Sequence, residues 1–228
     1  MNEIYWFLLL VLNFGAILLV YRLFGKAGLF IWIPISTIIA NLQVLKLVEL
    51  FGIEATLGNI VYATSFLATD ILSENYGKKD AKKAVYFGFI GLICMTIFMQ
   101  VALLFNPSQN DWANDSLTSL FALMPRIAFG SLAAYLLSQL HDVRAYDYWK
   151  VKFPETKYIW IRNNASTMVS QFIDTIVFTF IAFAGTMPWN VFLQVFLSTY
   201  FLKWIVAALD TPLVYVAKRW KNKVPSTL

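Results

Sequence analysis

The stretch FLATDILSENYGKK, Phe66–Lys79, ends a long apolar run in the first third of the chain. It carries Asp70 and Glu74 one helical turn apart, and then breaks at Tyr76-Gly77 into lysines. A carboxylate inside an apolar helix is costly unless it meets a partner or a wet cavity. The stretch therefore raises two questions: what surrounds this run, and what do its carboxylates bind?

Composition answers the first question. Of 228 residues, 59% are hydrophobic and 14% charged, and the mean hydropathy is +0.64. A soluble domain has about 45–50% apolar and about 25% charged residues. Segments of spanning length, about 17–25 residues, lie at about 4–24, 28–48, 57–75, 84–105, 118–140, 163–185 and 189–216. Because lipid offers no partners for backbone groups, we expect an all-α membrane protein, a polytopic bundle of seven transmembrane helices.

The basic residues favour one orientation of these segments, because Lys and Arg in short loops stay in the cytoplasm. One set of alternate loops holds most of the 18 lysines and arginines: Arg22 and Lys26; Lys78, Lys79, Lys82 and Lys83; Arg144, Lys150, Lys152, Lys157 and Arg162; Lys218, Arg219, Lys221 and Lys223. The opposite set holds Glu3, Glu49, Glu54, Asp111 and Asp115. We therefore expect the N-terminus outside and the C-terminus in the cytoplasm. This distribution explains the net charge of +5 without nucleic acid as a partner.

The chain divides into an N-terminal transmembrane helix, residues 1–26, a six-helix core, residues 27–217, and a basic cytoplasmic tail, residues 218–228. The first segment lacks the basic start of a signal peptide and should remain as an anchor. The last segment is long, so it either tilts or leaves the bilayer near Pro212. The single Cys94 excludes an internal disulfide, and the lone His141 is expected to be structural, so neither a metal nor a cofactor is predicted.

The charges left inside the predicted segments form a small informative set: Lys46, Asp70, Glu74, Arg126, Asp174, Lys203 and Asp210. They can be structural ion pairs, with the outermost merely reaching the interfaces. Helical stripes of polar residues beside them favour a binding site instead. In the sixth segment Asn163, Thr167, Ser170, Gln171 and Asp174 lie along one face, and in the second segment Thr37 and Asn41 do. Small polar residues can also serve as contacts between helices.

Four ordered motifs resemble the YhhQ-type queuosine precursor transporter family, which is related to vitamin uptake transporters. They are FLATDILSENYGKKDAKKA from Phe66, PRIAFGSLAAYLLSQLHDV at Pro125–Val143, NNASTMVSQFIDTIVFTFIAF at Asn163–Phe183 and TYFLKWIVAALDTPLVY at Thr199–Tyr215. The resemblance implies uptake of 7-cyano- or 7-aminomethyl-7-deazaguanine, or of queuine, across the bacterial plasma membrane for tRNA modification. The polar residues that match the family are Asn41, Asp70, Glu74, Arg126, Gln139, Asp142, Ser166, Thr167, Asp174 and Lys203.

These residue types suit a deazaguanine. Its N1–H and 2-amino group are parallel donors that one carboxylate can accept together. We assign this edge to Asp70 or Asp174, and the 6-oxo oxygen to Asn41, Gln171 or Lys203. A second carboxylate could bind an aminomethyl cation or carry a coupling proton. The ring could lie against Tyr62, Phe66 or Trp204, while Glu74 with Tyr76-Gly77 is expected to close the cytoplasmic end. The predicted substrate-binding residues are Asn41, Asp70, Glu74, Arg126, Gln171, Asp174 and Lys203.

Two alternatives to a solitary carrier remain. The chain could be the substrate-binding subunit of an energy-coupling-factor-type importer. Such subunits commonly dock through alanine-rich faces of an early helix, and the first segment has only Ala16. An intramembrane enzyme has less support, because the sequence has no HExxH pair, no Ser–His arrangement and no Walker loop. The expected partners are the small-molecule base and the lipid bilayer, and a homodimer is compatible with the sequence.

Overall fold

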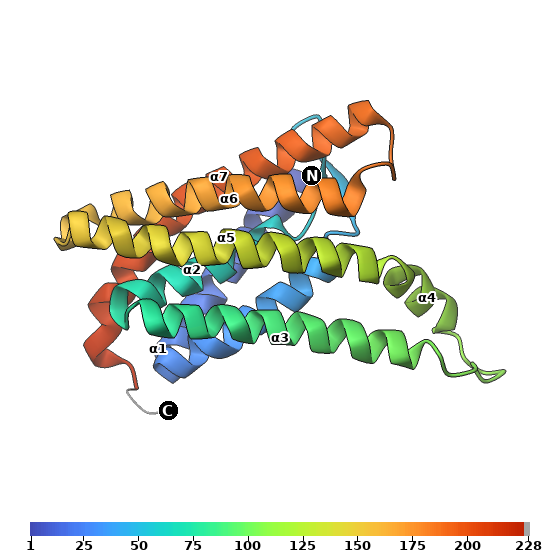
Figure 1. The fold of residues 1–228 in the computed structure, drawn as a ribbon, viewed down its shortest axis with the longest axis horizontal. Coiled ribbons are helices and arrows are strands. Elements are labelled where there is room, and N and C mark those ends of the chain that lie inside the picture. Colours follow the sequence, from blue (N-terminus) through green and yellow to red (C-terminus); the bar gives the residue numbers. More distant parts are fainter. Residues whose placement is uncertain (226–228) are drawn as a thin grey trace.

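The computed structural model describes residues 1–225 as a bundle of long helices with one small hairpin (Figure 1). The elements are α1 (Asn2–Gln43), β1 (Leu47–Leu50), β2 (Ile53–Thr56), α2 (Asn59–Asn75), α3 (Lys78–Ala102), α4 (Asn114–Ala122), α5 (Met124–Lys152), η1 (Thr156–Tyr158), α6 (Ile159–Phe183), α7 (Trp189–Trp220) and η2 (Lys221–Lys223). Four helices, α1, α3, α6 and α7, are long and apolar enough to cross a membrane, and α4 with α5 makes a fifth if that bent pair is one span. The chain is thus an all-α membrane protein.

Helix α1 contains both of the first two predicted segments and reverses direction between them. Gly25 has φ 55° and ψ −133°, a left-handed conformation that favours glycine. A Cβ atom placed on Gly28 would lie 2.5 Å from the carbonyl oxygen of Val20. In a continuous helix residues eight apart are about 12 Å apart, so the two halves pack against each other. The break lies next to the predicted boundary at residue 26.

The second predicted segment is wrong at its C-terminal end. It was expected to run as helix to residue 48, but α1 ends at Gln43 and β1 and β2 form an antiparallel hairpin. Lys46 therefore lies in the turn before β1 instead of inside a helix. The two short runs LVEL and IEAT around Phe51-Gly52 are a hairpin signal. The prediction missed it because the segment was assigned from its overall apolar composition. Asn2 donates to the carbonyl oxygen of Glu49, so the N-terminus lies at the hairpin.

The remaining predicted segments fall in helices with shifted ends. The fifth is broken at Leu123 into α4 and α5, which are bent by 41°, and Pro125 sits in the first turn of α5. The seventh continues through Pro212 to Trp220, beyond the start of the predicted tail. Residues 226–228 of that tail lie outside the described residues. The predicted loop that holds the basic residues from Arg144 to Arg162 is largely helical, because α5 runs to Lys152 and α6 begins at Ile159.

Helix α2 lies at the centre of the bundle, and every residue from Asn59 to Asn75 is buried. Other helices cover it from all sides, which explains how a segment with so many polar side chains is kept away from lipid.

The connections that carry the basic residues meet at one end of the bundle. Arg22 donates to the carbonyl oxygen of Lys223, and Lys78 pairs with Asp147. We call this the basic end. The hairpin, the N-terminus and the α6–α7 turn lie away from it (Figure 1).

Candidate functional site

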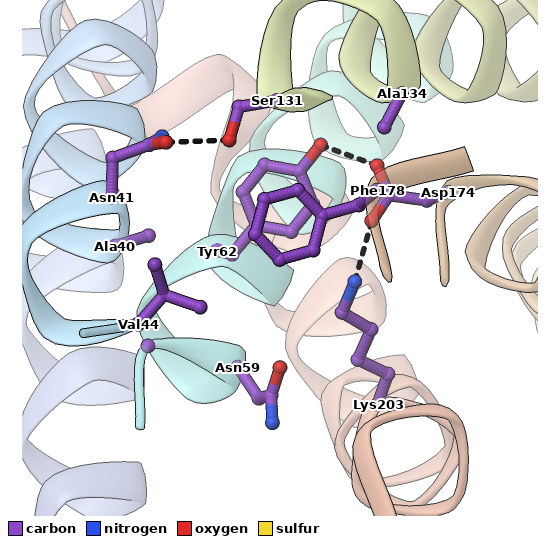
Figure 2. A pocket seen from close by; sticks show the side chains of 11 residues that line it. Ala40, Asn41, Val44, Asn59, Tyr62, Ser131, Ala134, Asp174, Phe178 and Lys203 are labelled. Carbon is purple, nitrogen blue, oxygen red and sulfur yellow. Dashed lines mark hydrogen bonds and ion pairs between the residues drawn. The ribbon is translucent and has the colours of Figure 1, made fainter. Parts of the chain in front are cut away.

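A small, partly open cavity lies between the hairpin end of α2 and its neighbours (Figure 2). Five helices contribute to its walls, so the site exists only in the assembled bundle. Its lining mixes aromatic rings with a small number of polar groups, as is usual for small-molecule sites. The lining residues are Ala40, Asn41, Val44, Gly58, Asn59, Tyr62, Ser131, Ala134, Asp174, Phe178 and Lys203.

The central polar feature of the cavity is the ion pair between Asp174 on α6 and Lys203 on α7. The Lys203 ammonium lies 2.5 Å from Oδ2 of Asp174, and both residues are nearly inaccessible to solvent. The Tyr62 hydroxyl donates to Oδ1 of Asp174 at 2.7 Å, and Ser138 donates to the same oxygen at 3.1 Å. Three donors thus balance the desolvation of one carboxylate. Lys203 also lies 5.0 Å from the centre of the Tyr62 ring.

The opposite wall holds Asn41 of α1. Ser131 of α5 donates to Oδ1 of Asn41 at 2.5 Å, and Nδ2 of Asn41 donates to the carbonyl oxygen of Thr37 at 2.9 Å. These bonds fix the orientation of the Asn41 amide. Phe178 and Tyr62 supply rings between this wall and the ion pair (Figure 2). The cavity therefore presents a carboxylate, an ammonium, an amide and two rings to one small volume.

Asp70, the first carboxylate of the opening stretch, does not line this cavity. It lies two helical turns along α2 from Tyr62, where Thr167 of α6 donates to its Oδ2 at 3.1 Å. The buried Asp142 of α5 lies close to it. Of the two acids to which the donor edge of the base was assigned, only Asp174 therefore lines the cavity. Gln171 is also outside the lining; it is fully buried, and neither atom of its amide has a partner within residues 1–225.

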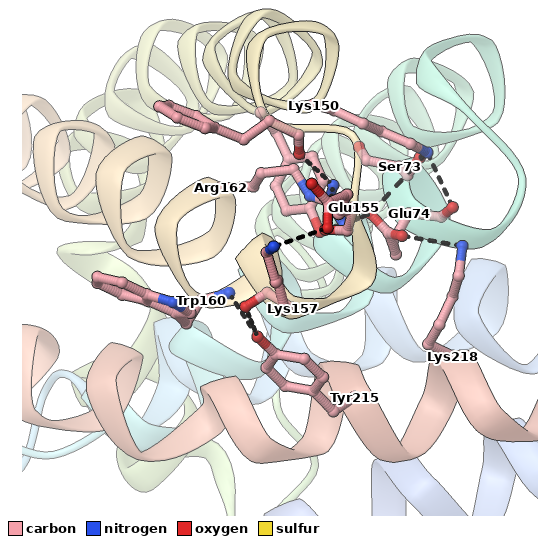
Figure 3. Close-up of polar contacts among 11 residues, drawn as sticks. Ser73, Glu74, Lys150, Glu155, Lys157, Trp160, Arg162, Tyr215 and Lys218 are labelled. Carbon is pink, nitrogen blue, oxygen red and sulfur yellow. Dashed lines mark hydrogen bonds and ion pairs between the residues drawn. The ribbon is translucent and has the colours of Figure 1, made fainter.

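Glu74 lies at the basic end among cations from three helices (Figure 3). Its carboxylate is 3.0 Å from Arg162, 2.9 Å from Lys218 and 4.0 Å from Lys150. Tyr146 also donates a hydrogen bond to it at 3.2 Å. Lys150 donates in addition to the last carbonyl groups of α2. This set, which we call the Glu74 cluster, joins α2, α5, α6 and α7 where the bundle ends.

Arg126 lies at neither of these places. Its guanidinium donates to the carbonyl oxygens of Ile181 and Ala184, at 2.8 and 2.5 Å, and so caps the C-terminal end of α6. It also lines a second cavity of about 670 Å³ beside the hairpin, which shares Val44 with the first. Of the seven predicted site residues the structure therefore brings three, Asn41, Asp174 and Lys203, into one cavity.

Several residues of these sites were not assigned a role from the sequence. Ser131, Ser138 and Phe178 have no signal that separates them from ordinary contacts between helices. Arg162 was counted among loop residues, yet it is fully buried at the start of α6. An arginine directly before the polar stripe of the sixth segment was the available signal. His141 bonds Ser170 at 2.8 Å, in keeping with a structural role.

Comparison with known proteins identifies the family. Residues 56–217 match the family described as "Putative vitamin uptake transporter". The chain is 46% identical over 218 residues to a "Probable queuosine precursor transporter" of Bacillus subtilis, covering 96% of this chain and 95% of that one. It is 29% identical to the protein of that name in Haemophilus influenzae, over 70% of this chain and 64% of the other. The "Queuosine precursor transporter" of Escherichia coli is 27% identical, over 60% of this chain and 58% of that one. No solved structure matches the chain. The chain therefore belongs to the vitamin uptake transporter family that includes these queuosine precursor transporters.

Proposed function

We propose that the chain is a solitary importer of queuosine precursors, 7-deazaguanine bases used for tRNA modification. The names of its relatives support this substrate class. The observation that carries the proposal is the Asp174–Lys203 pair inside a cavity with aromatic walls.

The chemistry of the pair suggests how a base is bound. In the empty site Lys203 and Tyr62 both hold the Asp174 carboxylate. A base whose N1–H and 2-amino group approach that carboxylate replaces these donors with a bidentate, charge-assisted pair. The displaced ammonium of Lys203 can then donate to the 6-oxo oxygen. The ring lies against Tyr62 or Phe178, and Asn41 holds the far edge. Binding thus exchanges one satisfied arrangement for another, without leaving a buried charge unpaired.

For the membrane we propose seven crossings in the bacterial plasma membrane, with α1 as two and the central α2 as one. The basic end faces the cytoplasm, because the four basic connections meet there. The cavity then opens towards the outside, and the Glu74 cluster closes the cytoplasmic end. A reporter fused after Lys83 or Lys223 should be cytoplasmic and one inserted at Asn110 external. Finding Asn110 and Lys223 on one side contradicts this orientation.

The transport proposal is tested in cells that cannot make the precursor. tRNA queuosine is measured with and without this gene while 7-cyano-7-deazaguanine, 7-aminomethyl-7-deazaguanine or queuine is supplied separately. We expect the gene to restore queuosine with at least one base, and Lys203→Met to abolish the effect because Asp174 loses its partner. Lys157→Met, at an exposed pair with Glu155, is the matched control and should retain uptake. Uptake by Lys203→Met equal to that of the wild type contradicts the site.

The alternative of a substrate-binding subunit makes a different prediction. A subunit of an energy-coupling-factor importer needs an ATP-driven partner, whereas a solitary carrier exchanges base by itself. Purified chain in proteoliposomes, loaded with unlabelled 7-cyano-7-deazaguanine, should take up labelled base without ATP. Binding of the base with no exchange favours the subunit.

A further inference from the structure

Three buried acids from three helices lie together between the cavity and the basic end. Asp70 of α2 faces Asp142 of α5, and Asp210 of α7 lies near both. Each is at most 1% exposed. Helix α6 completes the group, because Thr167 donates to Asp70 and Asn163 donates to Oδ1 of Asp210 at 2.9 Å. We call Asp70, Asp142 and Asp210 the acidic cluster.

The acidic cluster has acceptor atoms without donors. Within residues 1–225, Oδ1 of Asp70, both carboxylate oxygens of Asp142 and Oδ2 of Asp210 have no hydrogen-bond partner. Asn163, which is held against Asp210 through its nitrogen, also leaves its buried carbonyl oxygen without one. An unpaired buried acceptor is costly, and an unpaired buried carboxylate much more so. Three hydroxyl groups lie beside Asp142, those of Ser166, Thr167 and Ser170. They donate instead to the carbonyl oxygen of Asn163, to Asp70 and to the carbonyl oxygen of Ser166. The cluster therefore lacks hydrogen-bond donors of its own.

The charged groups around Asp70 supply no cation for this purpose. On the helices next to it, Lys203 is paired with Asp174, and Tyr146 donates to Glu74. Arg162 is buried with Glu74 in an ion pair of 3.0 Å, and its Nε and Nη2 atoms have no hydrogen-bond partner within residues 1–225. The other helices that pack on α2 direct their groups elsewhere: Tyr21 of α1 accepts from Asn75, and Lys26 of α1 pairs with Asp80 of α3. The charged groups close to Asp70 are Asp142 and Asp210, the other two members of the cluster, and both are acids. Three ionised carboxylates cannot persist together in such a place.

Protons fit these acceptors better than a base or a metal ion does. Neither of the two cavities described above is lined by a member of the acidic cluster. No group of three His, Cys, Asp or Glu side chains within residues 1–225 is arranged to hold a metal ion. A proton needs no cavity, only two facing carboxylates, which then share it and titrate as one unit.

We propose that Asp70 and Asp142 share one proton, and that the acidic cluster is the site at which base uptake is coupled to the proton gradient. The inference rests on the proposed function. The cluster and the cavity are mechanically linked, because α2 carries both Tyr62 and Asp70, and α6 carries both Asp174 and Thr167. A change at the Asp174 carboxylate when base binds therefore moves the two helices that hold Asp70. That movement opens the shared proton to one side of the membrane at a time.

The test uses the full chain in proteoliposomes with labelled 7-cyano-7-deazaguanine and a pH-sensitive dye inside. Two quantities are measured: exchange of base across the membrane without a gradient, and proton influx when base is added outside. Asp142→Asn removes the second acid while keeping shape, and Asp142→Glu restores an acid. Asp147→Asn is the matched control, because Asp147 lies on the same helix in an exposed pair with Lys78.

For the wild type we expect exchange together with influx of about one proton per base, as a shared proton implies. Asp142→Asn should keep base exchange and lose proton influx and accumulation against a gradient, Asp142→Glu should regain both, and Asp147→Asn should match the wild type. Wild-type exchange without proton influx overturns the inference and leaves the proposed function standing. Proton influx that survives in Asp142→Asn also overturns it. Absence of exchange in the wild type overturns the proposed function itself.

Discussion

Asp70 and Glu74 lie one turn apart on α2, both are buried, and their surroundings are opposite in charge. Glu74 meets Arg162, Lys218 and Lys150 within 4.0 Å. Asp70 meets a threonine hydroxyl and two further acids. Two neighbouring carboxylates on one helix thus have different partners. Glu74 links four helices through its ion pairs, whereas Asp70 belongs to the acidic cluster that we propose shares a proton.

The position of an acid in a membrane helix therefore does not determine which groups surround its carboxylate. The free energy of a buried carboxylate depends on charges and donors within a few ångströms. Here α5, α6 and α7 supply those neighbours, and all three are far from Asp70 and Glu74 in the sequence. Three substitutions measure how different the two places are.

The largest expected effect is that of Glu74→Gln. The amide leaves three cations without their common carboxylate, and breaking a buried ion pair costs about 3–5 kcal/mol. Denaturant unfolding in detergent micelles should show a loss of this size in the free energy of unfolding. Glu155→Gln, which removes the exposed pair with Lys157, should change it by less than about 1 kcal/mol. Similar losses for the two variants would remove the distinction between a buried cluster and a surface pair.

A smaller loss is expected for Tyr146→Phe. The Tyr146 hydroxyl donates to Glu74 at 3.2 Å and is buried, while the cations around Glu74 remain in this variant. A hydrogen bond to a charged group contributes about 1.5–3 kcal/mol, and we expect the lower value because Glu74 keeps its other partners. The same unfolding measurement applies, with the exposed Tyr148→Phe as control. Equal free energies of unfolding for the two variants would mean that the Tyr146 hydroxyl does not stabilise the Glu74 cluster.

The smallest effect on stability is expected for Asp70→Asn. The variant removes one of two facing acids, and its amide nitrogen can donate to the Asp142 oxygens that lack a partner. The free energy of unfolding should stay within about 0.5 kcal/mol of the wild type, as for a change without a broken pair. A loss as large as that of Glu74→Gln would mean that Asp70 is an ionised partner in a pair, and the contrast between the two acids would disappear.

Part of the site could be predicted because helical periodicity places residues on faces. The stripe from Asn163 to Asp174 is buried in the bundle, and Lys203 has the buried carboxylate partner that its depth required. Periodicity does not say which stripes meet. Arg126 and Glu74 were grouped with Asp174 from their residue types, yet one caps α6 and the other closes the basic end.

The membrane setting, the helical class, the basic connections and the family could be predicted from the sequence, because they depend on composition, local pattern and motif order. The reversal of α1 at Gly25, the hairpin after Gln43 and the pairing of particular acids with cations are seen only in the folded chain. These outcomes depend on contacts between segments far apart in the chain. The energy of a buried charge is set by such contacts at short range, and no local pattern records them.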